Sequence, residues 1–331
     1  MYETSFHPKS LTEFSFLITG GAGFIGSHLV EYLLKHNAKK VRVLDNLLTG
    51  REENIKLFSD QPAYEFLHGD IRNPDECREA CDEIDFVLHQ AALASVQRSM
   101  TDPVTTHVVN ADGFLNMLIA ARDSGVKRFV YASSSSVYGD HPDLPKQESK
   151  TGNPLSPYAV SKKTNELYAH VFATAFGMEV IGLRYFNIFG PRQDPNGPYA
   201  AVIPAFIRDL KNGEAPIIYG DGSQTRDFTF VENAVQANIK ALFTSHPDAL
   251  NQVYNVACGE PCSILQLFNM IALAMRLEVK PKLEAPRKGD ILHSTADVSK
   301  AKQLLQYLPS VSINEGLNIL LQSDIQESNN A

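Results

Sequence analysis

The sequence lacks the long apolar segments that insertion into a membrane requires. No apolar run in the 331 residues approaches the roughly 18 residues of a transmembrane helix. The first residues, MYETSFHPKSLTEF, have neither the basic start nor the apolar centre of a signal peptide. We therefore expect a cytoplasmic protein that has no membrane partner.

The sequence also lacks an excess of positive charge. It has 30 Lys and Arg against 38 Asp and Glu, which gives a formal net charge of −8 at pH 7. A nucleic-acid partner requires a basic face that displaces counterions from the phosphates, so we expect none. A small anionic ligand is still compatible with this charge, because a few arginines that converge locally are enough to hold it.

Cysteine is scarce. The four cysteines form two pairs with i,i+4 spacing, Cys77 with Cys81 and Cys258 with Cys262. Metal sites usually use closer Cys-x-x-Cys pairs or nearby histidines, and intracellular chains seldom keep disulfides. We expect four plain thiols and no metal site.

What the sequence does contain is an alternation of two patterns. From residue 14, short β-rich apolar runs alternate with segments of helical period: FSFLITG, GSHLVEYLLKH, KKVRVLDN, DFVLHQAA, ADGFLNMLIAARDSG and RFVYASS. Strands that alternate with amphipathic helices predict right-handed crossovers and a parallel sheet covered on both faces. The predicted fold class is therefore α/β, with a doubly wound sheet. Two later runs, EVIGLRYFN and NQVYNVA, predict that the sheet continues far beyond residue 150.

A glycine-rich segment follows the first predicted strand. ITGGAGFIGSH places Gly20, Gly23 and Gly26 at the start of a helix, where the backbone can approach a pyrophosphate that the helix N-terminus stabilises. The next strand ends at Asp45, 45 − 26 = 19 residues after the last glycine, where an acid accepts hydrogen bonds from an adenosine ribose. This acid would repel a 2′-phosphate, so the pattern predicts NAD rather than NADP. Asp70, in HGDI, ends another strand within reach of the adenine.

A second motif lies on a predicted helix. SPYAVSKKTNELYAHVF places Tyr158 and Lys162 four residues apart on one helical face. A lysine ammonium beside the tyrosine, with the positive nicotinamide ring nearby, favours the phenolate and lowers the tyrosine pKa toward neutrality. We expect Tyr158 to act as a proton shuttle, although the same spacing also occurs by chance on exposed helices.

A run of four serines supplies a third member of this set. RFVYA ends a strand at the carboxyl edge of the sheet, where doubly wound folds bind ligands, and Ser134 stands four residues before Tyr138 in SSSSVYG. The tyrosine of YAVSK follows 158 − 134 = 24 residues later. This arrangement, together with the GxxGxxG spacing, resembles the extended short-chain dehydrogenase/reductase family of nucleotide-sugar enzymes. The resemblance covers residues 14–320, nearly the whole chain.

The resemblance implies a Rossmann-like, doubly wound domain that binds NAD and a smaller, interleaved α/β lobe that binds the substrate. We expect residues 14–187, with 229–257 added, to form the NAD-binding domain. Residues 188–228 and 258–331 are expected to form the substrate-binding lobe.

The resemblance also implies the residues of the cofactor site. The catalytic residues are Ser134, Tyr158 and Lys162, and Phe186 in LRYFNIFGP is expected to flank the nicotinamide. The motifs and the resemblance together predict these cofactor-binding residues: Gly20, Gly23, Phe24, Ile25, Gly26, Asp45, Asn46, Asp70, Ile71, Gln90, Ala91, Ala92, Asn110, Ala132, Tyr158, Lys162, Tyr185 and Phe186.

The residues that follow the catalytic serine separate the reactions of this family. By resemblance, sugar-nucleotide 4,6-dehydratases carry Asp-Glu there and the decarboxylases carry Glu, whereas this chain has Ser135 and Ser136. Elimination therefore lacks its acid and base, and the resemblance implies epimerisation at C4 of a sugar. Tyr158 is expected to take the proton of the 4-hydroxyl while Ser134 hydrogen-bonds that oxygen, with the adjacent Ser135 as the alternative donor. The 4-keto sugar then turns and is reduced on its opposite face, so there is no net redox change.

Three segments resemble the parts of the family that hold a UDP-sugar: LRYFNIFGP, IIYGDGSQTRDF and APRKGDILHSTAD. By resemblance, Asn187 binds the diphosphate and Tyr219 packs on the base. Arg226 and Arg287 are expected to bind the phosphates, because a guanidinium group donates paired hydrogen bonds that fit phosphate oxygens. Asp290 is expected to accept hydrogen bonds from the ribose hydroxyls. The predicted substrate-binding residues are Ser95, Ser134, Ser135, Ser136, Asn187, Ala201, Val202, Tyr219, Arg226, Arg287, Asp290 and Ser294.

Small residues near the expected sugar indicate which sugar binds. Ser294 stands where epimerases of non-acetylated sugars carry a bulky tyrosine, Ala94 and Ser95 stand where they carry Lys-Ala, and Ala201 where they carry Asn. The nearest resemblance is therefore to bacterial UDP-N-acetylglucosamine 4-epimerases of surface-polysaccharide pathways. One pocket residue is worth only about 1–3 kcal/mol, so we expect a preference rather than exclusivity.

Three alternatives stay open. One is a UDP-glucose/UDP-galactose 4-epimerase. Another is a UDP-glucuronate 4-epimerase, which would need a cation at the C6 carboxylate that the sequence does not reveal. The third is a non-catalytic NAD- or sugar-nucleotide-binding protein, although degenerate relatives usually lose the tyrosine or the lysine that this chain keeps. The resemblance also implies a homodimer, formed through the helices DGFLNMLIAARDS and YAVSKKTNELYAHVFATAF.

Overall fold

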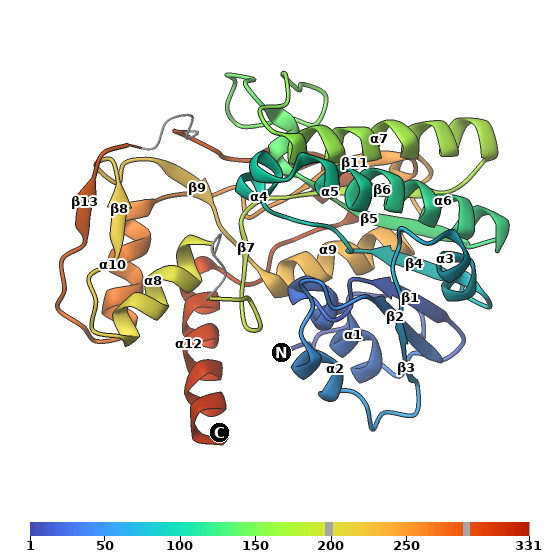
Figure 1. Ribbon diagram of the computed structural model, residues 1–331, viewed down its shortest axis with the longest axis horizontal. Coiled ribbons are helices and arrows are strands. Elements are labelled where there is room, and N and C mark those ends of the chain that lie inside the picture. The colour runs from blue at the N-terminus through green and yellow to red at the C-terminus, as the bar shows by residue number, and fades with distance from the viewer. Residues whose placement is uncertain (196–200, 287–291, 331) are drawn as a thin grey trace.

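The computed structural model describes residues 1–195, 201–286 and 292–330 (Figure 1). Seven strands, all parallel, form one sheet in the order β11-β6-β5-β4-β1-β2-β3. Their bounds are β1 Ser15–Thr19, β2 Lys40–Asp45, β3 Tyr64–His68, β4 Phe86–His89, β5 Arg128–Ser134, β6 Val180–Tyr185 and β11 Gln252–Val256. The predicted doubly wound α/β fold is confirmed, and the two late apolar runs are β6 and β11.

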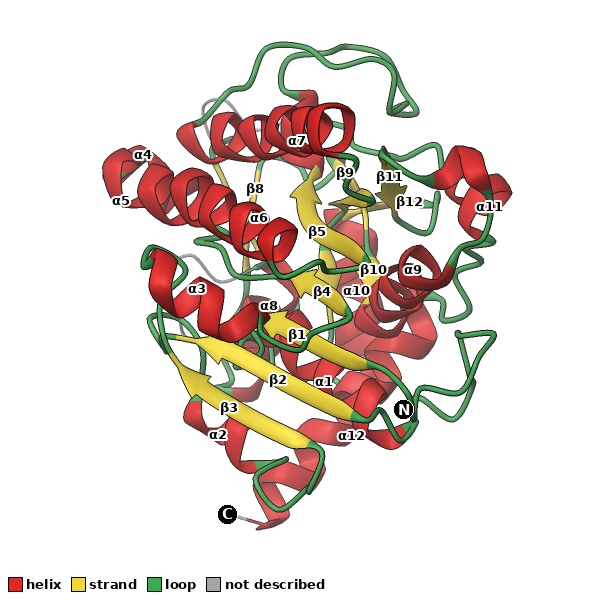
Figure 2. Ribbon diagram, turned by 90° about the vertical axis from the view of Figure 1, so that its right-hand side faces the viewer, coloured by secondary structure: helices red, strands yellow, loops and turns green. Residues whose placement is uncertain are grey.

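Helices cover both faces of this sheet (Figure 2). On one side lie α3 Pro74–Cys81, α4 Val96–Thr101, α5 Pro103–His107, α6 Gly113–Asp123 and α7 Pro157–Phe176, with the π-helical turn η1 Val108–Asp112 between α5 and α6. On the other side lie α1 Phe24–Lys35, α2 Glu52–Lys56, α9 Val231–Phe243 and α11 Ser299–Leu305. Each face has its own apolar core, because the strands are buried on both sides. Among the described residues no helix is long and apolar enough to cross a membrane.

The segment before β1 belongs to the core. Tyr2, Phe6 and Leu11 are almost completely buried against α1 and α9. The Phe6 ring stacks on Tyr32 of α1 with 5.4 Å between centroids, and its amide donates to the Tyr32 hydroxyl at 2.7 Å. The Tyr2 hydroxyl is hydrogen-bonded to Nδ1 of His28 at 2.7 Å. These residues precede the predicted domain start at 14, yet they complete its apolar face.

A smaller group of elements lies beside the carboxyl edge of the sheet, on the left of Figure 1. It has its own apolar core, which includes Phe206, Ile218, Leu267 and Leu317. Its helices are α8 Val202–Lys211, α10 Ile264–Ala274 and α12 Ile313–Asn330. Its strands pair two by two: β7 Ile188–Phe189 with β10 Thr229–Phe230, β8 Ile217–Tyr219 with β13 Lys282–Glu284, and β9 Thr225–Asp227 with β12 Pro261–Ser263. Two 3-10 turns, η2 Ser135–Tyr138 and η3 Pro247–Ala249, complete the described elements.

The chain passes between the two groups more than once. After β7 to β9 it returns to the sheet through α9 and β11, then leaves again for β12 and α10. Helix α11 packs against β11, and its residues Ala301 and Leu305 belong to the core of the sheet. The predicted lobe range 258–331 therefore includes a helix that covers the last strand of the other domain. The remaining domain boundaries stay a prediction.

Candidate active site

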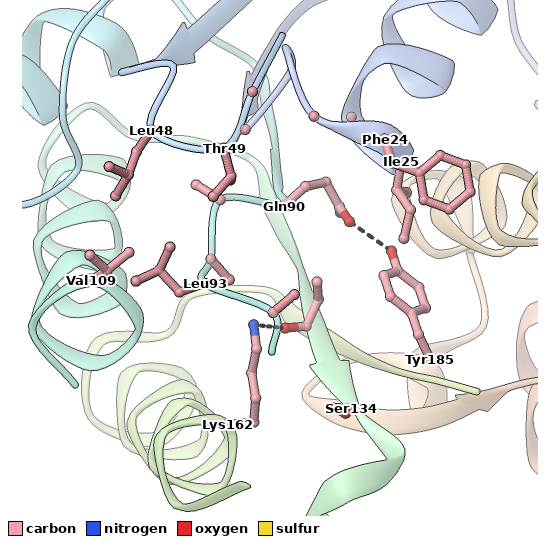
Figure 3. A pocket seen from close by; sticks show the side chains of 18 of the residues that line it. Phe24, Ile25, Leu48, Thr49, Gln90, Leu93, Val109, Ser134, Lys162 and Tyr185 are labelled. Atoms are coloured by element: carbon pink, nitrogen blue, oxygen red, sulfur yellow. Dashed lines mark hydrogen bonds between the residues drawn. The ribbon is translucent and has the colours of Figure 1, made fainter. Parts of the chain in front are cut away.

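A cavity of about 520 Å³ opens at the carboxyl ends of β1, β2, β4 and β5 (Figure 3). The strand order reverses between β1 and β4, and doubly wound folds bind ligands at this reversal. The predicted cofactor-binding residues that line the cavity are Gly20, Gly23, Phe24, Ile25, Gly26, Asp45, Asn46, Asp70, Ile71, Gln90, Ala91, Ala92, Ala132, Tyr158, Lys162 and Tyr185.

The glycine turn shapes the floor of this cavity. Gly20 has φ +70, and a Cβ on it would lie 2.7 Å from the backbone nitrogen of Ala91. A Cβ on Gly26 would overlap the carbonyl oxygen of Gly20, so the turn and the helix can be this close only without side chains. Helix α1 begins with no side-chain cap and no acidic residue in its first turn. Its N-terminal amides therefore suit an anion such as a pyrophosphate.

Two acids lie at the opposite end of the cavity from the catalytic residues. Asp45, the last residue of β2, accepts from the amides of Ala22 at 3.0 Å and Leu47 at 2.9 Å. Burial raises the pKa of Asp45, and these amide bonds lower it. Asp70 accepts from Arg72 and from Nδ2 of Asn46 at 2.7 Å. The Arg72 hydrogen bond lowers the pKa of Asp70 to about 2. The geometry suits a ribose diol at Asp45 and disfavours a 2′-phosphate.

Polar side chains anchor the wall between the sheet and α9. The hydroxyl of Tyr185 donates to Oε1 of Gln90 at 3.0 Å (Figure 3). Nδ2 of Asn238 donates to the Tyr185 hydroxyl at 2.7 Å. Residues from loops, strand ends and helix starts complete the wall, and no sequence motif reveals them. The lining residues that sequence reasoning missed are Leu44, Leu48, Thr49, Gly50, Gly69, Leu93, Val96, Val109, Ser133, Ile188 and Gln193.

Phe186, Asn110 and Ser95 were predicted as contacts but do not line either cavity. Phe186 is fully buried in a cluster with Tyr138 and Ala257, because adjacent residues of extended chain point to opposite sides and Tyr185 takes the cavity side. Asn110 lies behind the wall, where its side chain bonds both backbone groups of Leu93. Ser95 caps helix α4. In this structure these three side chains occupy supporting positions, and their direct contact with a ligand stays a prediction.

The structure brings Ser134, Tyr158 and Lys162 together. Ser134 ends β5, and Tyr158 and Lys162 lie on the first turns of α7, where Ser156 caps the helix. Burial raises the pKa of Tyr158, and a hydrogen bond with Ser134 lowers it. Nζ of Lys162 donates to the carbonyl oxygen of Ala132 at 2.8 Å (Figure 3) and lies 6.0 Å from the Tyr158 ring centroid. Burial lowers the pKa of Lys162 to about 8.

The serine run forms a fixed turn. Oγ of Ser134 accepts from the amide of Ser136 at 3.1 Å and donates to its hydroxyl at 3.0 Å, at the start of the 3-10 turn η2. Ser135 and Ser136 also line the cavity. Among the described residues that line it, the only acids are Asp45 and Asp70. The end that holds Tyr158 therefore has serine hydroxyls and no carboxylate.

A second cavity, of about 290 Å³, continues the site into the smaller group of elements. Asn187 lines both cavities, and its Nδ2 donates to the carbonyl oxygen of Asp227 at 3.1 Å. Predicted substrate residues on this second wall are Asn187, Ala201, Val202, Tyr219 and Arg226. Arg287 and Asp290 lie outside the described residues. Ser294 lines neither cavity; its amide donates to the carbonyl of Thr225 at 3.1 Å, beside Arg226.

A buried carboxylate fixes the backbone around Arg226. Asp227 is fully buried and accepts from the amides of Cys258, Gly259 and Ala296 at 3.0, 3.0 and 3.3 Å. Burial raises its pKa to about 6, and the three amides lower it. Sequence reasoning did not identify this residue. Because it joins β9 to Cys258 and Gly259 and to Ala296, it holds the backbone beside Arg226 in place.

All four cysteines are free thiols. Cys77 and Cys81 lie in the apolar core under α3, and burial raises the pKa of each to about 12. Among the described residues, no group of three or more His, Cys, Asp and Glu side chains could hold a metal ion.

A dinucleotide crevice beside a Ser, Tyr and Lys set defines a class: an extended short-chain dehydrogenase/reductase with a nicotinamide cofactor. The model of the NAD dependent epimerase/dehydratase family matches residues 16–257. The chain belongs to this family, and its cofactor is NAD. The glycine turn, the uncapped α1 and Asp45 are the features of this chain that fit that cofactor.

Several relatives of known name are similar over nearly the whole chain. A UDP-N-acetylglucosamine 4-epimerase from Methanobrevibacter ruminantium M1, solved with UDP-N-acetylmuramic acid, is 39% identical with a TM-score of 0.89, covering 95% of this chain and 99% of that one. A UDP-glucuronic acid 4-epimerase from Bacillus cereus, solved with UDP-glucuronic acid and NAD, is 32% identical with a TM-score of 0.87, covering 95% and 99%. A UDP-glucose 4-epimerase from Mycolicibacterium smegmatis is 37% identical over 303 residues, covering 91% of this chain and 95% of the relative.

Proposed function

We propose that this protein is an NAD-dependent UDP-sugar 4-epimerase that prefers UDP-N-acetylglucosamine and UDP-N-acetylgalactosamine and serves surface-polysaccharide synthesis. The observation that carries the reaction type is that Ser134, Tyr158 and Lys162 line one end of the cavity and that no described carboxylate lines this end. The three relatives support it further, because their names share epimerisation at C4 and differ in the sugar.

Each catalytic side chain has a defined task in this reaction. When bound, NAD supplies reversible hydride acceptance at the sugar C4. Tyr158 removes the proton of the 4-hydroxyl and later returns it, and Ser134 hydrogen-bonds the same oxygen. Lys162 lies buried between Tyr158 and the strand end, where its ammonium favours the phenolate and can hold a ribose hydroxyl. Asn187, at the junction of the two cavities, is placed to bind the diphosphate.

The preference for an acetylated sugar depends on small residues along the path between the two cavities. Ala94 lines the first cavity and Ala201 the second, so neither fills the space with a long side chain. Ser294 is half-buried beside β9. Room at these positions favours a sugar that carries an N-acetyl group at C2.

Two other sugars remain as alternatives within the same reaction type. For UDP-glucuronate, a cation at the C6 carboxylate would help, but among the described residues that line the two cavities the cations are Lys162 and Arg226. Lys162 bonds Ala132, and Arg226 is assigned to the phosphates, so this set favours a neutral sugar. UDP-glucose fits any pocket that admits the acetylated sugar and is expected to react more slowly.

The pocket assignment is tested by enlarging Ser294. We expect Ser294→Tyr to lower kcat/KM for UDP-N-acetylglucosamine about 10-fold or more while that for UDP-glucose changes little, since one pocket contact is worth roughly 1–3 kcal/mol. Ser59→Tyr, on an exposed surface away from the cavities, is the matched control. An unchanged ratio of the two substrates would show that another residue sets the preference.

We also propose a homodimer, formed through α7 as expected from the sequence, but with α4 and α5 in place of the expected α6, whose apolar side chains are buried or half-buried. These helices pack against each other, and their outer faces expose Met100, Val104, Leu167 and Val171, with Val104 71% and Leu167 60% exposed. Apolar side chains on neighbouring helices are the pattern of a contact between two copies of a chain.

A further inference from the structure

Three residues of helix α7 face the end of strand β5 at regular spacing. Tyr158, Lys162 and Glu166 are each four residues apart and so lie on one helical face. The side chain of Ser134 is near enough to Tyr158 to lower its pKa, and Lys162 donates to the carbonyl of Ala132 at 2.8 Å. Oγ of Ser133 donates to Oε1 of Glu166 at 2.7 Å. One helix therefore holds Ala132 and Ser133 by hydrogen bonds and places Tyr158 beside Ser134.

Glu166 is itself held rigidly. Arg184 of β6 donates to both of its oxygens, from Nε to Oε1 at 2.8 Å and from Nη2 to Oε2 at 2.9 Å. Arg184 is 2% exposed, and its guanidinium lies 4.9 Å from the ring centroid of Tyr138, on the turn that follows the serines. A bidentate pair fixes the direction of the carboxylate as well as its distance.

We propose that Glu166, held by Arg184, is a positioning residue for the reaction: through Ser133 it fixes the end of β5 so that Ser134 meets Tyr158 in the productive geometry. This inference rests on the proposed catalytic roles of Ser134 and Tyr158. Glu166 does not line the cavity, so it acts through the strand and not on the substrate.

A buried ion pair of this kind is not explained by stability alone. Removing two charges from water costs several kcal/mol, and apolar side chains of similar size often stabilise a core as well or better. The pair joins β6, α7 and the catalytic end of β5, and its additional hydrogen bond goes to the residue next to Ser134. Displacements of about 1 Å at a reacting group cost roughly 100-fold in rate. A fixed strand end therefore has a catalytic consequence.

The first test is Ser133→Ala, which removes one hydroxyl and leaves the Glu166 and Arg184 pair intact. We expect kcat for the preferred UDP-sugar to fall roughly 10- to 100-fold, with KM, bound NAD and melting temperature close to wild type. The matched control is Ser15→Ala, since Ser15 is 5% exposed and its Oγ also donates to a carboxylate, that of Asp85, at 3.3 Å. Ser15 is the first residue of β1, so it lies at the amino-terminal ends of the strands, away from the catalytic residues.

The second test adds Glu166→Gln, alone and combined with Ser133→Ala. If Glu166 acts through Ser133, the double variant has about the same kcat as Glu166→Gln, because the two changes break one connection. Glu179→Gln is its control: Glu179, the residue before β6, pairs at 2.7 Å with Arg128, the first residue of β5. The proposal is overturned if Ser133→Ala keeps wild-type kcat, or if kcat falls only in step with NAD content or melting temperature. An inactive wild-type enzyme would instead contradict the proposed function.

Discussion

The ammonium of Lys162 donates its hydrogen bond to the carbonyl of Ala132, at 2.8 Å, and not to Tyr158. The sequence predicted that this lysine lowers the pKa of Tyr158. In the protein alone, burial raises the pKa of Tyr158 and lowers that of Lys162 to about 8. Both groups are therefore driven toward their neutral forms. The positive charge of the nicotinamide ring is therefore also needed, when the cofactor is bound, to favour the phenolate of Tyr158.

The lowered pKa of Lys162 predicts a pH-dependent stability. Its folded pKa of about 8 lies below the ordinary value of 10.5, so between these pH values the unfolded chain binds more protons and stability rises with pH. Below about pH 8 Lys162 is charged in both states, and burial of this charge then lowers the free energy of unfolding by the full pKa difference, roughly 2–4 kcal/mol. For the nucleotide-free protein we expect Lys162→Met to be relatively stabilised at pH 7 and to lose this advantage as the pH rises above 8. Urea unfolding at several pH values measures it. Lys163→Met, at a partly exposed position, is the control. The prediction would be contradicted if the difference in unfolding free energy between Lys162→Met and wild type did not change with pH.

Asp45 is expected to set the cofactor preference. Its carboxylate is held by two amides where an adenosine ribose would lie. We expect Asp45→Ala to weaken NAD binding about 10-fold. We also expect it to reduce the difference in affinity between NAD and NADP, because the repulsion of the 2′-phosphate is removed. Titration of nucleotide-free protein with each cofactor measures both. Asp60→Ala, at an exposed position, should change neither. Tight NADP binding by the wild-type protein would be inconsistent with this role.

The segment before β1 is expected to contribute to stability. Leu11 is completely buried in the core that α1 and α9 form. Leu11→Ala should lower the free energy of unfolding by about 2–5 kcal/mol, the usual range for a buried leucine. Its exposed neighbour provides the control, since Thr12→Ala removes no buried contact. Equal unfolding free energies for the two variants would show that the segment does not hold the core together.

The proposed homodimer predicts an effect of charge on the outer face of α7. Leu167→Glu should convert a dimer to a monomer, because a carboxylate in an apolar interface pays its full desolvation cost. Light scattering after size-exclusion chromatography measures the mass. Leu308→Glu is the matched control, since Leu308 is 63% exposed on another part of the molecule. A monomeric wild-type protein, or a dimeric Leu167→Glu variant, would contradict the proposed interface.

The features set by local chemistry were predictable from the sequence. The glycine turn, Asp45, and the Tyr158 and Lys162 pair follow from residue type and spacing, and each lies on the cavity wall. The alternation of strands and helices likewise predicts the parallel sheet. The cytoplasmic location stays a prediction.

The features that depend on tertiary packing were not predictable. A motif does not reveal which of two adjacent aromatic residues faces a cavity, and here Tyr185 does while Phe186 is buried. The burial of Tyr2 and Leu11, and the hydrogen bonds that Asp227 makes to three distant amides, join segments far apart in the chain. No local pattern encodes such contacts.

The most direct test of the central claim is to incubate the purified protein with UDP-N-acetylglucosamine, with no added reductant, and to identify the product by NMR. The account predicts UDP-N-acetylgalactosamine without net formation of NADH, and slower conversion of UDP-glucose to UDP-galactose. Tyr158→Phe should lose at least about 100-fold in rate while it keeps bound NAD. A dehydrated or decarboxylated product, faster turnover of the non-acetylated pair, or no conversion at all would contradict the account.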